Sequence, residues 1–286
     1  MVDDILPPDE RGYADPSILV TTDWLMEHIG DANVVVVDTD DPSEYAEGHI
    51  PGASNPPDNY YKTSLEDRTH IQGSEQFAVT MSALGIGDDS LVVAYDRTGG
   101  LYALRLMWAL HYYRHYNVKM LDGGYQRWVV DGGAVSTVAY QSDGSASFTP
   151  RGPDRSIYAD MNDVLAAIGS DDTTLLDVRT DGEWEGSNKR GGKRGGRVPG
   201  AIHLEWVNFH TGGDVPTLRT ADELRALLAD QRVSTDGEVI TYCQGGIRAA
   251  QAYWVLKLVG AERVRNYDAS WREWGNNEEV PVENET

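Results

Sequence analysis

The stretch EVITYCQGGIRAAQAYWVLKLVG, Glu238 to Gly260, decides the fold of the part of the chain in which it lies. Its first five residues form a short apolar run, which is typical of a central parallel strand covered by helices on both faces. After the turn, AAQAYWVLKLVG repeats apolar residues at spacings of three and four and ends on Gly260, which predicts a helix. A strand, a turn and a helix in this order indicate an α/β sheet.

The same alternation of strands and helices occurs elsewhere in the chain. Three other runs have the strand pattern: VVVVD (34–38), LVVAY (91–95) and TLLDV (174–178). Three have the helical pattern: DWLMEHI (23–29), ALRLMWALHYY (103–113) and ADELRALLAD (221–230). We therefore expect the fold class α/β, with open and mainly parallel sheets flanked by helices. In such sheets, functional sites form at the carboxyl ends of the strands.

An internal repeat organises the chain. Residues 17–40 align with residues 156–179 without a gap, at an offset of 139. Farther on, LDGGYQRW (121–128) matches YDASWREW (267–274) at an offset of 146. Two copies of one domain suit a chain of 286 residues, because domains usually contain about 100 to 150 residues.

The repeat predicts the domain boundaries. We expect a first domain at 1–136 and a second at 156–286. The join between them, 137–155, is rich in Ser, Gly and Pro and has no sustained period, which is typical of a linker. Two tandem copies can bury each other's surfaces without a partner chain, so we expect a monomer.

The charge of the chain excludes some classes of function. It has 24 basic and 46 acidic residues, and a net charge of −22 repels nucleic acid and anionic membrane surfaces. This excess predicts adaptation to high salt, with an ordinary acidic protein as the alternative. The beginning MVDDILPPDERGYADP does not resemble a signal peptide, and no apolar run is long enough to span a membrane. We therefore expect a cytoplasmic protein.

Cys243 is the only cysteine, which excludes an internal disulfide and any zinc site built on several thiolates. Gly245 and Gly246 allow backbone N–H groups to converge beside it, and the N-terminus of the predicted helix adds partial positive charge. Arg248 supplies a permanent cation, so the position favours a reactive thiolate. The alternative is a small core residue, but a glycine turn that ends in arginine is not a typical core position.

These residues resemble the rhodanese family of sulfurtransferases, in its form with two tandem domains. The resemblance rests on CQGGIR (243–248) as the active-site loop, and it covers nearly the whole chain. It also rests on four further motifs: VVVVDTDDPSEYAEGHIPGASN (34–55), TLLDVRTDGEWEGSNKRGGKRGGRVPGAIHLEW (174–206), LDGGYQRWVVDGG (121–133) and YDASWREWG (267–275). In this family the first copy has usually lost its cysteine, and Asp96 stands here at the matching position. The resemblance implies a non-catalytic first domain and a catalytic second domain.

The resemblance implies a double displacement through Cys243. The thiolate attacks the outer sulfur of thiosulfate, sulfite leaves, and cyanide or a thiol then collects the sulfur from the persulfide. The active-site loop that holds the persulfide consists of Gln244, Gly245, Gly246 and Ile247. The reaction needs a small anionic donor and a thiophilic acceptor, and neither a cofactor nor a metal is expected.

Two arginines are candidates for binding the oxyanion of the donor. Arg248 offers a planar fork that suits sulfonate-like oxygens, and no arginine stands at the corresponding position of the first copy, Leu101. Arg179 is the second candidate, and its alternative is a structural ion pair with Asp177 or Glu183. The animal-type tandem enzymes have an arginine where this chain has Glu183, so the resemblance implies that the anion is recognised differently here.

Other functions stay open beside thiosulfate sulfurtransferase. Mercaptopyruvate sulfurtransferases resemble this architecture, but their loop usually has no arginine. Dual-specificity phosphatases of the same fold have five residues between cysteine and arginine, whereas four stand here. Cys243 could also serve as a persulfide carrier between proteins in thiolation pathways, and an inert Cys243 would indicate a regulatory binding module.

An insertion of nine residues in the second copy lies within GSNKRGGKRGGR, Gly186 to Arg197, which contains five basic residues. One interpretation is a flexible basic flap that attracts anionic donors, with Lys193, Arg194 and Arg197 contributing charge. The other is a solvated loop without a role, and the general tolerance of loops for insertions favours it.

Overall fold

The computed structural model describes residues 5–56 and 69–284. Contacts divide the chain into two compact units. Unit 1 contains Met1–Gly12, Pro16–Asp154 and His210–Leu218, and unit 2 contains Tyr13–Asp15, Arg155–Phe209 and Arg219–Thr286. Most of the predicted linker, up to Asp154, thus belongs to unit 1, because Phe148 is buried there and its N–H group donates to the Ser82 hydroxyl (3.0 Å).

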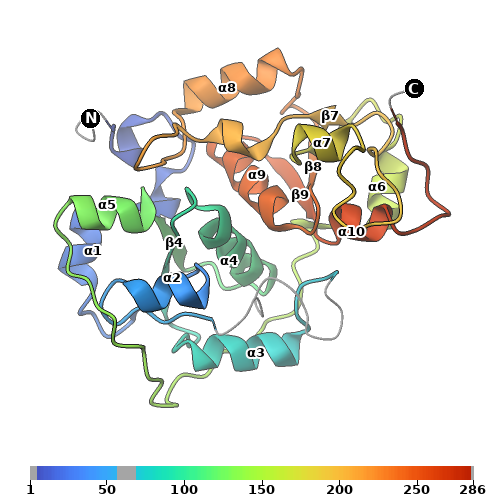
Figure 1. The fold of residues 1–286 in the computed structure, drawn as a ribbon. Coiled ribbons are helices and arrows are strands. Elements are labelled where there is room, and N and C mark those ends of the chain that lie inside the picture. The colour runs from blue at the N-terminus through green and yellow to red at the C-terminus, as the bar shows by residue number, and fades with distance from the viewer. Residues whose placement is uncertain (1–4, 57–68, 285–286) are drawn as a thin grey trace. The chain divides into compact units, whose positions relative to one another are not determined.

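Unit 1 is built on a sheet of four parallel strands, shown with its helices in Figure 1. The strand order is β1-β4-β3-β2, where β1 is Leu19–Val20, β2 Val34–Asp38, β3 Leu91–Tyr95 and β4 Val118–Leu121. The α-helices are α1 (Thr22–His28), α2 (Pro42–Glu47), α3 (Ser74–Ala83), α4 (Leu101–Tyr112) and α5 (Gly124–Val130). Two short 3₁₀ turns, η2 (Pro8–Glu10) and η3 (Pro16–Ile18), precede β1.

Unit 2 repeats this plan with a sheet of five parallel strands. The order is β5-β9-β8-β6-β7, where β5 is Tyr158–Ala159, β6 Thr173–Asp177, β7 Ile202–His203, β8 Glu238–Tyr242 and β9 Arg263–Tyr267. The helical segments are α6 (Met161–Ala167), α7 (Asp181–Trp184), η4 (Trp206–Phe209), α8 (Ala221–Asp230), α9 (Ile247–Leu258) and α10 (Ser270–Trp274). The predicted fold class, α/β with open parallel sheets flanked by helices, is confirmed.

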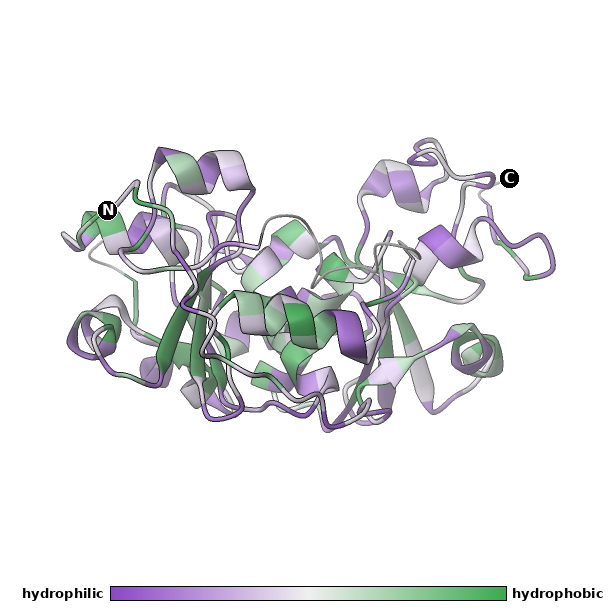
Figure 2. Cartoon of the chain, turned by 90° about the horizontal axis from the view of Figure 1, so that it is seen from below, coloured by the Kyte–Doolittle hydropathy of each residue, from purple (hydrophilic) through white to green (hydrophobic). Residues whose placement is uncertain are grey.

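The strand registers confirm the repeat. Asp38 pairs with Tyr95 in unit 1, and Asp177 pairs with Tyr242 in unit 2, so the same two strands meet in the same register. The predicted strands at 34–38, 91–95 and 238–242 have the observed bounds, whereas β6 begins and ends one residue earlier than predicted. Figure 2 shows that the strands are predominantly hydrophobic, as expected of strands buried on both faces. Cys243 and Asp96 both follow the carboxyl end of a central strand.

Candidate active site

Cys243 lies where the chain turns from β8 into α9, and the turn contains only Gln244, Gly245 and Gly246. Gly246 has a left-handed backbone (φ 78°), which glycine adopts without the steric cost of a side chain. The cysteine is 1% exposed. The sequence thus places a nearly buried sulfur at the N-terminus of a helix of twelve residues, where the helix dipole favours negative charge.

The end of β9 and the segment that follows it anchor the turn through side chains. The hydroxyl oxygen of Ser270 accepts hydrogen bonds from the N–H groups of Cys243 (3.0 Å) and Gly246 (3.1 Å). The Ser270 hydroxyl donates in turn to the carbonyl of Tyr267 (2.7 Å). Asn266 donates its side-chain amide to the carbonyl of Gly246 (3.1 Å). Both ends of the turn are therefore fixed by one buried segment.

The backbone of α10 anchors the middle of the turn. The N–H groups of Trp271 and Arg272 donate to the carbonyls of Cys243 and Gln244, both at 2.9 Å. By contrast, the N–H groups of Gln244 and Gly245 have no acceptor within the described residues. Backbone N–H groups without acceptors in such a turn can stabilise an anion next to the sulfur.

Arg248 forms a two-pronged ion pair with Glu183: Nη1 lies 2.7 Å from Oε2 and Nη2 lies 2.9 Å from Oε1. The side chain of Glu183 is fully buried and that of Arg248 is 12% exposed. Burial opposes the charge on Arg248, but hydrogen bonding to Glu183 and electrostatic interactions with Cys243 and Glu183 raise the pKa of Arg248. Burial likewise opposes the charge on Glu183, but the hydrogen bonds from Arg248 and Thr180 lower the pKa of Glu183 to about 2. The fork of Arg248 is thus occupied by Glu183.

Arg179 is buried and paired with Asp177. Its Nε lies 2.9 Å from Asp177 Oδ1 and its Nη2 lies 2.5 Å from Oδ2, and Nη2 also donates to the carbonyl of Gly196 (2.8 Å). The guanidinium carbon lies 4.3 Å from the ring centre of Trp271. The ion pair with Asp177 is the structural alternative to substrate binding that the sequence analysis left open for Arg179. Substrate binding by Arg179 or by Arg248 stays a prediction, and bidentate binding by either would require an existing ion pair to break.

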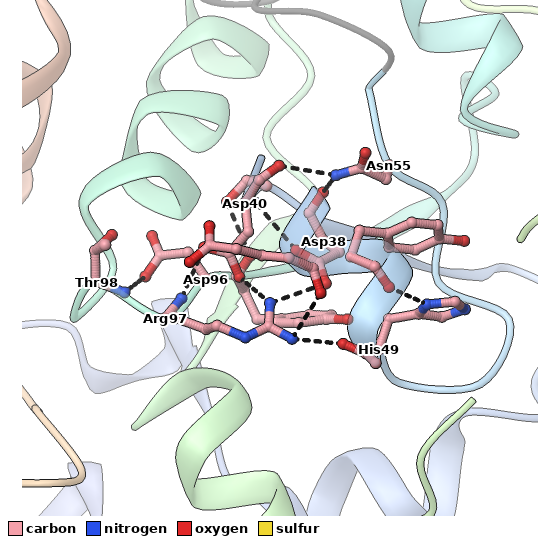
Figure 3. Close-up of polar contacts among 12 residues, drawn as sticks. Asp38, Asp40, His49, Asn55, Asp96, Arg97 and Thr98 are labelled. Atoms are coloured by element: carbon pink, nitrogen blue, oxygen red, sulfur yellow. Dashed lines mark hydrogen bonds and ion pairs between the residues drawn. The ribbon is translucent and has the colours of Figure 1, made fainter. Parts of the chain in front are cut away.

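The corresponding turn of unit 1 holds an anion of its own, the carboxylate of Asp96. Asp96 Oδ1 accepts hydrogen bonds from the N–H groups of Thr98 and Gly100, both at 2.8 Å. Asp96 Oδ2 accepts from the N–H groups of Tyr102 (2.7 Å) and Ala103 (2.9 Å). Figure 3 shows the bond between Asp96 and Thr98. A strand-to-helix turn of this kind therefore binds negative charge, and in unit 1 a side chain supplies it.

The turn of unit 1 is one residue longer than the turn of unit 2. Gly100 and Gly246 both have left-handed backbones and directly precede α4 and α9. The residue in unit 1 that corresponds to Arg248 is therefore Tyr102, the second residue of its helix. The assignment of Leu101 to this position is wrong, because a constant offset from the strand cannot account for the extra residue in the turn.

Two buried acidic residues at the end of β2, Asp38 and Asp40, lie beside the turn of unit 1 and are drawn in Figure 3. Arg97 lies 2.5 Å from Asp40 and 3.6 Å from Asp38. Burial, together with the neighbouring charges of Asp96 and Asp38, raises the pKa of Asp40 to about 8. Within the described residues, no group of three or more His, Cys, Asp or Glu side chains is arranged to hold a metal ion.

The comparison with protein families decides the identity of the two units. A model described as the rhodanese-like domain matches residues 21–131 and again residues 160–277. The chain belongs to the rhodanese family. The recognition made from the sequence is thereby confirmed, including the tandem arrangement.

Relatives of this rhodanese-family protein match it over nearly its full length. The sulfur carrier protein TtuD of Thermus thermophilus is 35% identical, covering 95% of this chain and 98% of that protein. A protein of Haloferax volcanii named "Putative thiosulfate sulfurtransferase" is 34% identical, covering 93% and 96%. Both matches thus cover more than nine-tenths of this chain and of the relative.

Solved structures are also similar to this rhodanese-family chain. The anaerobic ergothioneine biosynthesis enzyme of Chlorobium limicola, in complex with trimethyl histidine, has a TM-score of 0.86 at 25% identity, covering 96% of this chain and 72% of that chain. A structure of a variant of EanB with a persulfide on a cysteine, in a tetrahedral intermediate state with ergothioneine, has the same TM-score, identity and coverage. All helices of the described chain are too short or too polar to cross a membrane.

In unit 2 of this rhodanese-family protein, hydrogen bonds and an ion pair with residues 274–283 hold the basic insertion in place. Arg194 donates from Nη1 to the carbonyl of Val280 and from Nη2 to the carbonyl of Trp274, both at 2.8 Å. Arg197 pairs with Glu283 at 2.8 Å. Neither a flexible flap nor a freely solvated loop describes these two arginines, because both hold the loop in place.

Two residues near Cys243 escaped the sequence analysis, Ser270 and Arg272. Both lie in YDASWREW, which the sequence analysis used only as part of the repeat and of the family resemblance. The sequence contained a signal for Ser270, because the repeat aligns it with a glycine, Gly124. In the structure both residues have left-handed backbones, with φ near 55°. Unlike Gly124, Ser270 has a hydroxyl oxygen, and this oxygen accepts hydrogen bonds from two N–H groups of the turn.

Proposed function

We propose that this rhodanese-family protein is a sulfurtransferase that takes the outer sulfur atom of thiosulfate onto Cys243 as a persulfide. The observation that carries the proposal is the turn around Cys243, which combines a buried sulfur, two N–H groups that have no acceptor among residues 5–56 and 69–284, and the N-terminus of α9. The equivalent turn of unit 1, which binds the carboxylate of Asp96 through four N–H groups, supports an anion at this place. A persulfide anion is the natural occupant of the turn in unit 2.

The two half-reactions balance without a proton donor. In the first, the Cys243 thiolate attacks the outer sulfur of thiosulfate, the S–S bond to the sulfonate breaks, and sulfite leaves with its electron pair. In the second, cyanide or a thiolate attacks the outer sulfur of the persulfide and the Cys243 thiolate leaves. No charge is created or removed in either step. The N–H groups of the loop and the nearby guanidinium of Arg248 therefore have to stabilise an anion throughout.

The choice of donor rests on the chemistry of the loop and on the relatives. The loop keeps the cation of Arg248 next to the sulfur, which suits a dianionic donor such as thiosulfate. The Haloferax volcanii relative carries the name of a thiosulfate sulfurtransferase. Mercaptopyruvate, whose single carboxylate would need less positive charge, is the alternative donor. The persulfide in the EanB structure supports the same covalent intermediate on this fold.

A second function is favoured by one comparison. The relative with 35% identity is named a sulfur carrier protein, and its match covers 98% of its length. In that role Cys243 would accept persulfide sulfur from a protein donor and deliver it to another protein. The difference between the two functions is the rate of turnover with small molecules.

Mass spectrometry of the intact protein tests the proposal. We expect incubation with thiosulfate to add one sulfur atom, and cyanide to remove it with formation of thiocyanate. The Cys243→Ser variant should gain nothing, because its hydroxyl cannot form a persulfide under these conditions. If the wild type gains sulfur from mercaptopyruvate but not from thiosulfate, the donor assignment is wrong. If it loads with thiosulfate once but does not turn over with cyanide, the carrier function replaces the enzymatic one.

A further inference from the structure

The two ion pairs next to the active-site loop have little net charge. Arg248 is paired through both terminal nitrogens with Glu183, and Arg179 is paired with Asp177. Each pair joins one positive and one negative group, so its net charge is close to zero. A dianionic donor binds more strongly where positive charge is in excess, so a further cation at either pair would favour it.

Arg190, in the basic insertion, lies beside the pair of Arg248 and Glu183. Its Nε lies 4.0 Å from Glu183 Oε1, the oxygen that also accepts from Nη2 of Arg248 (2.9 Å). The cluster of Arg190, Glu183 and Arg248 therefore has two cations for one carboxylate, which gives a net charge of +1. The side chain of Arg190 is 54% exposed, whereas that of Glu183 is fully buried. A dissolved anion can therefore reach the cation that gives the cluster its excess charge.

The insertion folds so that Arg190 is held at this place. The N–H group of Asn188 donates to the carbonyl of Gly182 in α7 (2.7 Å), and the N–H group of Gly192 donates to the carbonyl of Lys189 (2.8 Å), which closes a tight turn around Arg190. The remainder of the insertion is bound to the C-terminal residues through its arginines. Arg190 thus belongs to a loop that is anchored on both sides, and one of its anchors, α7, also carries the carboxylate of the cluster.

The backbone of Arg190 is unusual for a residue with a side chain. Its φ is 47°, in the left-handed region that glycine adopts freely and that a Cβ atom disfavours. A strained residue of this kind is consistent with a role of its side chain. The conformation also selects the substitution for a test. Asparagine adopts it more readily than most residues with a side chain, so Arg190→Asn removes the charge and keeps the turn.

We infer that Arg190 makes Cys243 selective for sulfur donors that carry an oxyanion, an inference that rests on the proposed function. The sulfonate of thiosulfate is attracted to the excess positive charge of the cluster, and the planar fork of a guanidinium suits its oxygen atoms. Negative charge moves onto the sulfonate as sulfite leaves, so a cation nearby also favours the bond-breaking step. A donor without negative charge gains nothing from Arg190. Arg190 is therefore a specificity-determining residue, and Arg248 is a positioning residue that holds positive charge beside the sulfur.

The first test compares the two half-reactions in Arg190→Asn at low ionic strength. In a double-displacement mechanism, kcat/KM for each substrate reports the half-reaction of that substrate alone. We expect kcat/KM for thiosulfate, a dianion, to fall about tenfold, and kcat/KM for cyanide to fall about threefold or less, because cyanide carries at most one charge. Arg190→Lys should recover most of the thiosulfate reaction. Equal losses in both half-reactions would indicate a structural role and overturn the inference, as would unchanged kinetics.

Lys193→Gln is the matched control. Lys193 lies in the same insertion as Arg190, its side chain is 62% exposed, and it pairs with the exposed carboxylate of Glu278 (3.3 Å). The variant therefore loses one positive charge from the same loop, but from a pair that does not include Glu183. We expect its kinetics to stay within about twofold of those of the wild type. A comparable fall in the thiosulfate reaction of this control would mean that the net charge of the loop, and not the position of Arg190, determines the selectivity.

Alkylation of Cys243 tests the inference without thiosulfate. Iodoacetate carries a negative charge and iodoacetamide does not, so the ratio of their rates measures the positive charge near the thiolate. We expect Arg190→Asn to lower the ratio of the iodoacetate rate to the iodoacetamide rate at least about threefold at low ionic strength. An unchanged ratio would overturn the role of Arg190. If the ratio falls as expected but the wild type takes no sulfur from thiosulfate, the proposed donor is wrong and the recognition of anions by Arg190 is upheld.

Discussion

At the scale of single residues, Glu183 holds the guanidinium of Arg248 in place and balances its charge. The carboxylate accepts from both terminal nitrogens of Arg248 and also from the backbone and hydroxyl of Thr180, where it completes a capping box for α7. Burial of this carboxylate without Arg248 would leave an uncompensated charge. The two residues are 65 positions apart, so the pair links two segments of unit 2 that both border the active-site loop.

We predict that Glu183→Gln lowers the free energy of unfolding by about 2 to 4 kcal/mol at pH 7, because it leaves a largely buried guanidinium without its counter-ion. The pKa of Glu183 is lowered to about 2 in the folded protein. The stabilisation is therefore present above the unfolded pKa, near 4.5, and is lost as the pH falls toward 2. Urea unfolding from pH 7 to pH 3 should show the gap between variant and wild type narrowing. Glu185→Gln, an exposed neighbour, is the control, and an equal effect there would contradict the prediction.

At the scale of elements, the strand, turn and helix that carry Cys243 occur twice with different occupants. Unit 1 fills the turn with the carboxylate of Asp96, and unit 2 leaves N–H groups next to a sulfur. Because four N–H groups at the start of α4 depend on Asp96, this carboxylate stabilises unit 1 as a helix cap does.

We predict that Asp96→Ala destabilises unit 1 by about 2 kcal/mol or more, since four N–H groups, all at least partly buried, lose their acceptor. Relief of the repulsion between Asp96 and Asp40 offsets part of this loss. The emptied turn should bind a small anion, so added sulfate should raise the melting temperature of the variant more than that of the wild type. Thermal unfolding with and without sulfate measures both effects. Asp89→Ala, which removes an exposed carboxylate, should show neither, and a similar response there would refute the capping role.

The sequence predicted the elements better than the contacts between them. The bounds of β2, β3, β8 and α8 follow from local apolar patterns, and the observed ranges agree. The position of Cys243 after a strand followed from the same patterns. The partner of Arg248 could not be predicted, because charge type alone does not select Glu183 among the acidic residues of the chain. Arg272 was missed because its contact with Gly245 depends on how α10 folds back onto the turn.

At the scale of the whole molecule, the net charge of −22 acts on stability. Like charges repel more strongly when the chain is compact than when it is unfolded, so the folded state carries the larger electrostatic cost. Salt screens this repulsion between exposed groups, with a Debye length of about 10 Å at 0.1 M and about 3 Å at 1 M. Buried pairs such as Glu183 and Arg248 are screened much less, so salt removes the repulsion and keeps the pairing.

We predict that the melting temperature rises by about 5 to 10 °C between 0.1 M and 2 M KCl, which corresponds to about 3 to 6 kcal/mol in a chain of 286 residues. Most of the rise should occur below about 1 M, because screening is nearly complete there. Differential scanning calorimetry across a KCl series measures the curve, and sorbitol at matched osmolality is the control. A linear rise that sorbitol reproduces would indicate exclusion of solute from the protein surface. A flat curve would mean that the acidic excess is already balanced by local pairing, and the expected adaptation to salt would then be wrong.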